Sequence, residues 1–156
     1  MVGLAVDSAS INADRIVPRL WQGANPPQGV TLKNAGVQLL VLCAEELQYP
    51  DSAFPGVLVL RAPMQDSRSV PVETAMLAAE QVARAWKEGL RCLVCCHMGL
   101  NRSGLVTALT LWRATGASGR RCAAMVREKR YGALSNPWFS AYLDTLLPRG
   151  LPLQAR

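Results

Sequence analysis

The sequence has little that would place it in a membrane or in an oxidising compartment. Its longest apolar runs, such as residues 37–44, fall far short of the about 20 residues that span a bilayer. Residues 1–6 lack the basic start and long apolar core of a secretory signal. The five cysteines are odd in number and three lie between positions 92 and 96, unlike a disulfide framework. We expect a soluble cytoplasmic protein, a monomer with no membrane partner.

Acidic residues and histidine are also scarce. Against 17 basic residues there are 11 acidic ones and a single histidine, which gives a net charge of +6. The half-site Cys92-x2-Cys95-Cys96-His97 therefore finds no second pair of ligands of the kind structural zinc needs, and we expect no metal and no cofactor. The positive charge favours anionic partners, namely phosphorylated protein, nucleotide or RNA, without choosing between them.

Much of the positive charge lies in one basic cluster near the C-terminus. We interpret the cluster as a solvated helix face, with guidance of acidic substrates as the alternative. Its members are Arg120, Arg121, Arg127, Lys129 and Arg130.

The length and the apolar content indicate one folded unit. With 156 residues, half of them hydrophobic, the chain can bury a core without disulfides or metals. No linker, repeat or low-complexity tract divides it. We expect a single domain over residues 1–156, with a core at about 14–147 and loose ends at Met1 to Asn12 and Arg149 to Arg156.

Apolar patterns predict an α/β fold. We predict a first strand at 16–21. Continuous apolar stretches of strand length predict further strands at 37–43, 57–60 and 90–95, buried on both faces. Helical spacing and end signals predict helices at 30–35, 72–87, 103–115, 119–129 and 137–147. The expected fold is a central, mostly parallel sheet of about four to five strands flanked by helices, with a helical C-terminal half and ligands at the carboxyl ends of the strands.

A motif between the last predicted strand and the next helix carries the chemistry. A strand that turns into a helix aims the backbone N–H groups of the turn at one point, where an anion is stabilised. A cysteine beside that point is favoured as the nucleophilic thiolate, and an arginine fork can hold two phosphoryl oxygens. We predict that Cys96 is the nucleophile and that residues 97–102 bind phosphate. The motif reads Cys96-His97-Met98-Gly99-Leu100-Asn101-Arg102-Ser103-Gly104.

The C-x5-R spacing followed by Ser resembles the signature of the cysteine-dependent protein tyrosine phosphatases, and the whole chain is similar to their small dual-specificity type. Arg15 to Gly23 is similar to the opening strand of that family, so the resemblance covers roughly residues 14–147. It implies a metal-independent phosphatase in which Asp66, thirty residues before Cys96, is the general acid. It also implies that the Ser103 hydroxyl contacts the nucleophile sulfur.

Several residues of this motif keep alternative interpretations. Asp66 could simply cap a turn, and Asp51 is a weaker candidate for the acid. Ser103 could serve only as a helix cap. His97 could contribute its backbone N–H alone, or a side chain at the rim of the pocket.

The cysteines next to the motif depart from the family pattern or add to it. The family usually has histidine immediately before the nucleophile, where this chain has Cys95. Cys43 resembles the cysteine that forms a disulfide with the nucleophile in tensin-type phosphoinositide phosphatases under oxidation. Cys95 is the other candidate for this redox partner, and an inert Cys43 is the alternative.

The function expected from the resemblance is hydrolysis of phosphomonoesters through a cysteinyl phosphate, most directly of phosphotyrosine in proteins and also of phosphoserine or phosphothreonine. Asn101 before Arg102 is similar to the loop of RNA 5′-triphosphatases, but the sequence shows no aromatic platform for RNA. Phosphoinositide phosphatases usually place lysine in the loop, and residues 97–101 contain none. A phosphate-binding pseudophosphatase is the alternative that is not an enzyme.

Overall fold

A five-stranded sheet forms the centre of the molecule. The computed structural model describes residues 6–150. No helix in that part of the chain is long and apolar enough to cross a membrane. The elements are β1 (Ala13–Val17), β2 (Leu20–Gly23), α1 (Thr31–Ala35), β3 (Leu39–Ala44), a 3₁₀ turn (Asp51–Ala53), β4 (Leu58–Met64), α2 (Val72–Lys87), β5 (Cys92–Cys95), α3 (Arg102–Thr115), α4 (Gly119–Lys129) and α5 (Pro137–Asp144).

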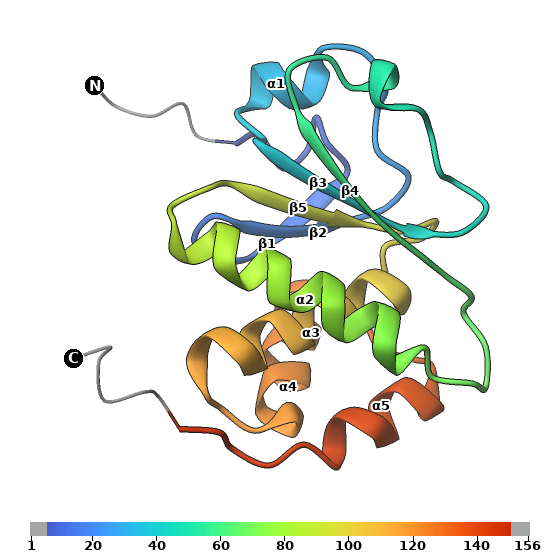
Figure 1. Cartoon of the computed structure of the whole chain (residues 1–156), viewed down its shortest axis with the longest axis vertical. Helices are drawn as coiled ribbons and strands as arrows, with labels where there is room; N and C mark the ends of the chain where they lie inside the picture. Colours follow the sequence, from blue (N-terminus) through green and yellow to red (C-terminus); the bar gives the residue numbers. More distant parts are fainter. Residues whose placement is uncertain (1–5, 151–156) are drawn as a thin grey trace.

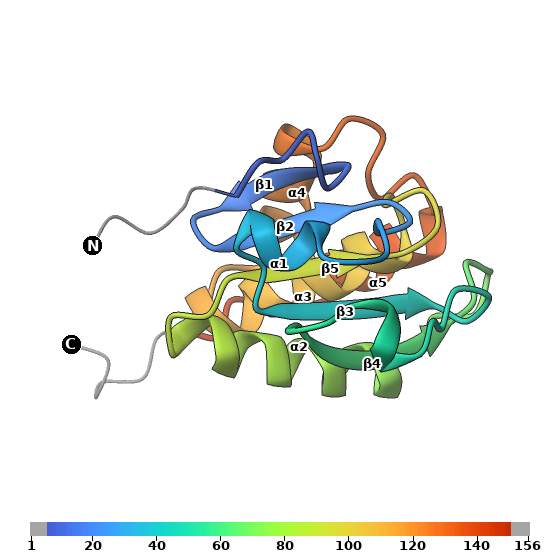
Figure 2. The same cartoon turned by 90° about the horizontal axis from the view of Figure 1, so that it is seen from above.

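The sheet is mostly parallel, as the apolar runs predict. Its strand order is β1-β2-β5-β3-β4, and only β1 runs antiparallel to its neighbour. The four parallel strands end at Gly23, Ala44, Met64 and Cys95. Because parallel strands share one direction, these four ends lie along the same edge of the sheet (Figure 2).

Helices cover both faces of the sheet unequally. Figure 1 shows α2 to α5 on one face and α1 on the other. The larger core cluster lies on the first face and includes Val94, Leu109 and Phe139, whereas the smaller one includes Leu32, Leu40 and Phe54. Helix α3 is the centre of the larger cluster, with 11 of its 14 residues buried. An α/β domain with a helical C-terminal half is the expected class.

The strand predicted at 16–21 is instead a hairpin. Val17 pairs with Leu20, so Pro18 and Arg19 form a two-residue turn between β1 and β2. Proline fixes its own φ and donates no N–H, which favours a turn over a continuous strand. Arg19 adopts a φ of 66°, and the Trp86 indole N–H donates to the Pro18 carbonyl (2.7 Å), which holds the turn against α2.

Three further boundaries or environments differ from the prediction. Strand β4 is an edge strand and its Leu58 is 65% exposed, because burial on both faces requires neighbours that an edge strand lacks. Helix α5 ends at Asp144 rather than at 147, since Thr145 caps it. Ile11 is fully buried in the smaller core, so the expected loose N-terminal end does not extend to it. Of the expected loose ends, residues 1–5 and 151–156 lie outside the described residues.

Candidate active site

The candidate nucleophile lies at the carboxyl end of the central strand. Cys96 follows β5 directly, and its N–H donates to the Gly23 carbonyl (3.3 Å) at the end of the neighbouring β2. The Cys96 sulfur lies 3.2 Å from the Ser103 hydroxyl in the first turn of α3. The residue is 4% exposed. Ser103 therefore contacts the sulfur, and the side-chain cap that we considered as its alternative is absent at this end of α3.

The backbone carbonyl groups of the loop after Cys96 are bonded by donors that lie outside the loop. Each of the four from His97 to Leu100 accepts a hydrogen bond from another part of the chain. Within residues 6–150, the N–H groups of residues 97–101 donate to no protein acceptor. The peptide dipoles therefore turn their donor ends to the inside of the loop, as an anion site requires. The donors to the carbonyls are Asn25 N (3.0 Å) for His97, Arg130 Nη2 (3.1 Å) for Met98, Gln22 Nε2 (3.0 Å) and Arg130 Nε (2.9 Å) for Gly99, and Leu134 N (3.0 Å) for Leu100.

Gly99 permits this close packing. Its φ of 73° is in the left-handed region, and a Cβ at this position would lie 2.4 Å from the Gly23 carbonyl carbon. No side chain fits there without a shift of the backbone. The loop therefore lies directly on the end of β2.

Arg102 is fixed by a carboxylate that the sequence analysis did not identify. Its Nη1 and Nη2 donate to the two carboxylate oxygens of Glu46 (2.6 and 2.7 Å), and Nη1 also donates to the Met64 carbonyl (3.1 Å). The hydrogen bonds from Arg102 lower the pKa of Glu46 to about 2, and the same pair raises the pKa of Arg102. The buried Arg102 Nε has no partner among the described residues. The Nε donor of the guanidinium therefore remains for an oxyanion.

Asp66 lies over the same loop. It follows β4 by two residues, and its carboxylate accepts from Asn101 Nδ2 (3.0 Å) and Asn136 Nδ2 (2.7 Å). Asn101 belongs to the nucleophile loop, and Asn136 Oδ1 caps α5 by accepting from the N–H groups of Trp138 and Phe139. Asp51 is instead in a surface pair with Arg61 (2.7 Å). The structure thus brings Asp66, and not Asp51, to the loop of Cys96.

The two candidate redox partners lie on opposite faces of the sheet. Cys43 belongs to the same core cluster as Cys96, whereas Cys95 belongs to the smaller cluster on the other face. This follows from the alternation of side chains along a strand. Burial raises the pKa of both the Cys43 and the Cys95 thiols, and the nearby Cys96 raises them further. All five cysteines are free.

Sequence reasoning missed four residues that support the site, namely Gln22, Glu46, Arg130 and Asn136 as a partner of Asp66. Gln22 is a polar residue in an apolar strand, and Glu46 follows the end of a strand, so both carried a readable signal. Arg130 was assigned to a solvated helix face, but it pairs with Asp14 (3.0 Å) and its side chain is 13% exposed. The other four members of that basic cluster are exposed or half-exposed at the surface of α4.

The His97 side chain is exposed and close enough to Glu46 to contribute to the low pKa of that carboxyl.

Comparison with known proteins agrees with this geometry. No family model matches the chain. Human dual specificity phosphatase 28 is 33% identical over 136 residues, which cover 83% of this chain and 74% of that protein. The chain belongs to the dual-specificity phosphatases. This is a type within the cysteine-dependent protein tyrosine phosphatase superfamily, so phosphorylated substrates are expected of it.

Solved structures of the family share the fold over nearly the whole chain. A mouse putative dual specificity phosphatase complexed with zinc tungstate superimposes with a TM-score of 0.77 at 30% identity, covering 89% of this chain and 88% of the other. Human dual specificity phosphatase 28 superimposes with a TM-score of 0.72 at 29% identity, covering 86% and 91%. The fold that carries the loop is therefore that of this family of protein phosphatases.

Proposed function

We propose that this dual-specificity phosphatase hydrolyses phosphomonoesters, in the first place phosphotyrosine in proteins and also phosphoserine or phosphothreonine. One observation carries the proposal: the carbonyl groups of the loop are bonded outward, while its N–H groups and Arg102 Nε have no protein acceptor within residues 6–150. Such a cradle fits the equatorial oxygens of a phosphoryl group, and Cys96 lies at its base.

In the first step, the Cys96 thiolate attacks phosphorus and the bond from phosphorus to the leaving oxygen breaks. Asp66 gives its proton to that oxygen, so the alcohol or phenol departs neutral and the enzyme holds a cysteinyl phosphate. The N–H groups of the loop and Arg102 bind the phosphoryl oxygens throughout.

In the second step, the ionised Asp66 takes a proton from water, and the oxygen of that water attacks the cysteinyl phosphate. The sulfur leaves as a thiolate, and Ser103, 3.2 Å from it, donates a hydrogen bond that stabilises the departing charge. Inorganic phosphate is released and Asp66 is protonated again. The residues that act need no metal.

The proposal is tested with a substrate panel that holds phosphotyrosine, phosphoserine and phosphothreonine peptides, triphosphate-ended RNA and a phosphoinositide. Cys96→Ser should reduce kcat to background on every substrate that the enzyme accepts, a loss of roughly 10⁴-fold or more. Asp66→Asn should slow phosphopeptides by about 10²-fold and aryl phosphates with good leaving groups much less, because only poor leaving groups need the proton. Asp51→Asn is the matched control, since it removes a carboxylate outside the loop.

Each rival interpretation has its own outcome in this panel. Turnover of RNA ends or of phosphoinositide above that of phosphopeptides would change the substrate class. Binding of phosphopeptide without any thiol-dependent release of phosphate would identify a pseudophosphatase. Substantial activity in Cys96→Ser would refute the nucleophile assignment.

A further inference from the structure

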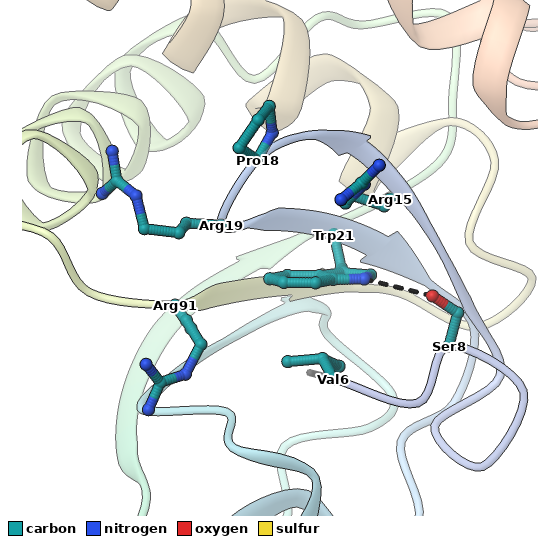
Figure 3. Close-up of a pocket in the computed structure, with 7 residues that line it drawn as sticks. All are labelled: Val6, Ser8, Arg15, Pro18, Arg19, Trp21 and Arg91. Atoms are coloured by element: carbon teal, nitrogen blue, oxygen red, sulfur yellow. Dashed lines mark hydrogen bonds between the residues drawn. The ribbon is translucent and has the colours of Figure 1, made fainter. Parts of the chain in front are cut away.

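A second hollow lies at the opposite edge of the sheet from Cys96. It has a volume of about 480 Å³ and opens beside the β1–β2 turn and the start of β5 (Figure 3). Arg19 precedes β2 and Arg91 precedes β5, so both lie at the amino ends of strands whose carboxyl ends form the active site. Arg15, on β1, lies across from Trp21 in the register of the hairpin. The length of β5 separates this hollow from the nucleophile loop.

The charge around the hollow is of one sign. Three arginines line it, and no carboxylate of the described part of the chain does. Five other arginines form ion pairs with Asp or Glu among residues 6–150, but Arg15, Arg19 and Arg91 form none. Three cations placed around one cavity repel one another, and an anion between them would remove that cost.

Two of these arginines are held in place by backbone carbonyls rather than by counter-ions. Arg91 Nε donates to the Gly36 carbonyl (2.5 Å). Arg19 donates through Nη1 to the Trp86 carbonyl, and its guanidinium stacks over the Trp86 ring (5.1 Å to the centroid). Arg19 also occupies the left-handed region at a φ of 66°, which is unfavourable for any residue with a side chain. The fold thus holds the side chains of Arg19 and Arg91 in place. On each guanidinium it leaves N–H donors that have no acceptor among residues 6–150.

The shape of the hollow indicates the kind of anion. Figure 3 shows the Trp21 ring edge-on, with Arg15 and Arg19 above it and Arg91 below it. The Trp21 indole N–H is already bonded to Ser8 Oγ (3.2 Å), so the ring offers an apolar floor. Cations that are spread apart fit a ligand with several separated negative groups, and planar guanidinium forks fit phosphate. The volume is that of a small-molecule site.

We propose that this hollow, the amino-edge site, binds a small ligand that carries two or more phosphate groups. The site is separate from the active site and does not depend on the proposed phosphatase activity. The phosphates can belong to a free molecule or to a lipid headgroup, because the same cations would recognise either.

The test measures binding to the full chain carrying Cys96→Ser, so that no probe is hydrolysed. The soluble probe is inositol 1,4,5-trisphosphate, followed by calorimetry and by tryptophan fluorescence, since Trp21 lines the site. The lipid probe is a phosphatidylcholine vesicle with 5 mol% phosphatidylinositol 4,5-bisphosphate, at roughly physiological salt so that surface charges are screened. Arg15→Gln/Arg91→Gln should weaken binding by about tenfold or more, because two charge-assisted hydrogen bonds are removed.

Three comparison variants decide where the probe binds. Arg121→Gln/Lys129→Gln removes the same charge from the exposed face of α4 and should leave binding within about twofold. Arg102→Gln should also leave it unchanged. Arg15→Glu repeats the test without touching the Arg91 bond to Gly36, should Arg91→Gln disturb folding.

Loss of binding in the Arg15 and Arg91 variants alone supports the site. Better binding of the soluble probe or of the vesicle then identifies the source of the phosphates. Loss of binding with Arg102→Gln instead would place the probe in the active site. An equal loss of binding with the α4 variant would mean that only the net charge of the protein matters. Either result, or no binding by the parent chain at 1 mM probe, overturns the proposal.

Discussion

The nucleophile loop and the loop of Asp66 lie side by side at one edge of the sheet, but they are held in different ways. The nucleophile loop is bonded through its backbone carbonyls. The donors come from β2 and the segment after it, from Arg130 at the C-terminal end of α4, and from the segment before α5. Asp66 is held through its side chain by two amides, from Asn101 and Asn136. Asp66 and Gln65 are exposed, whereas Cys96, Gly99 and Arg102 are buried.

This difference matches the two tasks that we propose for these loops. A cradle for phosphate must keep its dipoles fixed through both steps, because reorientation at each step would add to the barrier. A general acid must deliver a proton and then receive one, so it needs an exposed side chain with exchangeable partners.

Among the variants that keep Cys96 and Asp66 in place, the largest effect is expected from Gly99→Ala. The new Cβ would lie 2.4 Å from backbone carbon of Gly23 at a φ of 73°, so the loop must move away from β2. A displacement of this size should lower kcat by about 10²-fold. Steady-state kinetics and thermal unfolding measure it. Gly89→Ala is the control, because it has a similar φ of 96° and nothing within 4 Å. Equal activity of the two variants would mean that packing against β2 does not determine the active position of the nucleophile loop.

Asn136→Ser disturbs the Asp66 loop alone. Serine keeps an oxygen that can cap α5 but loses the amide that donates to Asp66 Oδ1 (2.7 Å) and to the Ser67 carbonyl (2.9 Å). We expect kcat on phosphopeptides to fall by about tenfold, with a smaller change on aryl phosphates that have good leaving groups. Unfolding temperature reports on the cap. A uniform loss on all substrates would indicate damage to the nucleophile loop instead.

Cys43→Ser tests recovery from oxidation. Hydrogen peroxide converts the Cys96 thiolate to a sulfenic acid with release of hydroxide, and the Cys43 thiol then displaces water to form a disulfide that dithiothreitol reduces. We expect Cys43→Ser to recover roughly half or less of the activity that the parent recovers after such a cycle. Cys95→Ser should behave as the parent, since Cys95 lies on the other face of the sheet. The reverse ranking would make Cys95 the partner.

The smallest effect concerns Glu46. Its pKa of about 2 in the fold is below the usual value near 4.5, so the pair with Arg102 stabilises the fold above about pH 4.5 and is lost as the pH falls toward 2. Glu46→Gln should therefore flatten the dependence of the unfolding free energy on pH between these limits. Because the Glu46 side chain is 45% exposed, the loss at pH 7 should stay below about 1 kcal/mol. Denaturant titrations at several pH values measure it, with Glu128→Gln as the exposed control.

The sequence was sufficient for the parts of the site that adjoin strand ends. Cys96 and Asp66 both follow apolar runs, and parallel strands bring such positions to one edge. The side chains that brace them could not be found in the same way. Gln22 and Gly99 are separated by 77 positions in the sequence, and Asn136 and Asp66 by 70. These contacts arise only when α5 and β2 pack against the loop.

The errors in the fold arise where an apolar or charged run in the sequence does not determine how its residues are placed. Apolar runs give the identity of strands but not their order, so the exposure of Leu58 on the edge strand β4 was not predictable from them. The β1–β2 turn is different, because Pro18 marks a break that the apolar pattern around it concealed. Arg130 shows the same limit for charge, since a basic run does not reveal which member turns inward.

Helix α3 begins at Arg102, and 11 of its 14 residues are buried. Arg102 is thus the first residue of the most enclosed helix among residues 6–150, and that end cannot fray without opening the larger core. Amide hydrogens of this first turn should exchange only when the whole domain opens, and heating should abolish turnover and tertiary packing at the same temperature.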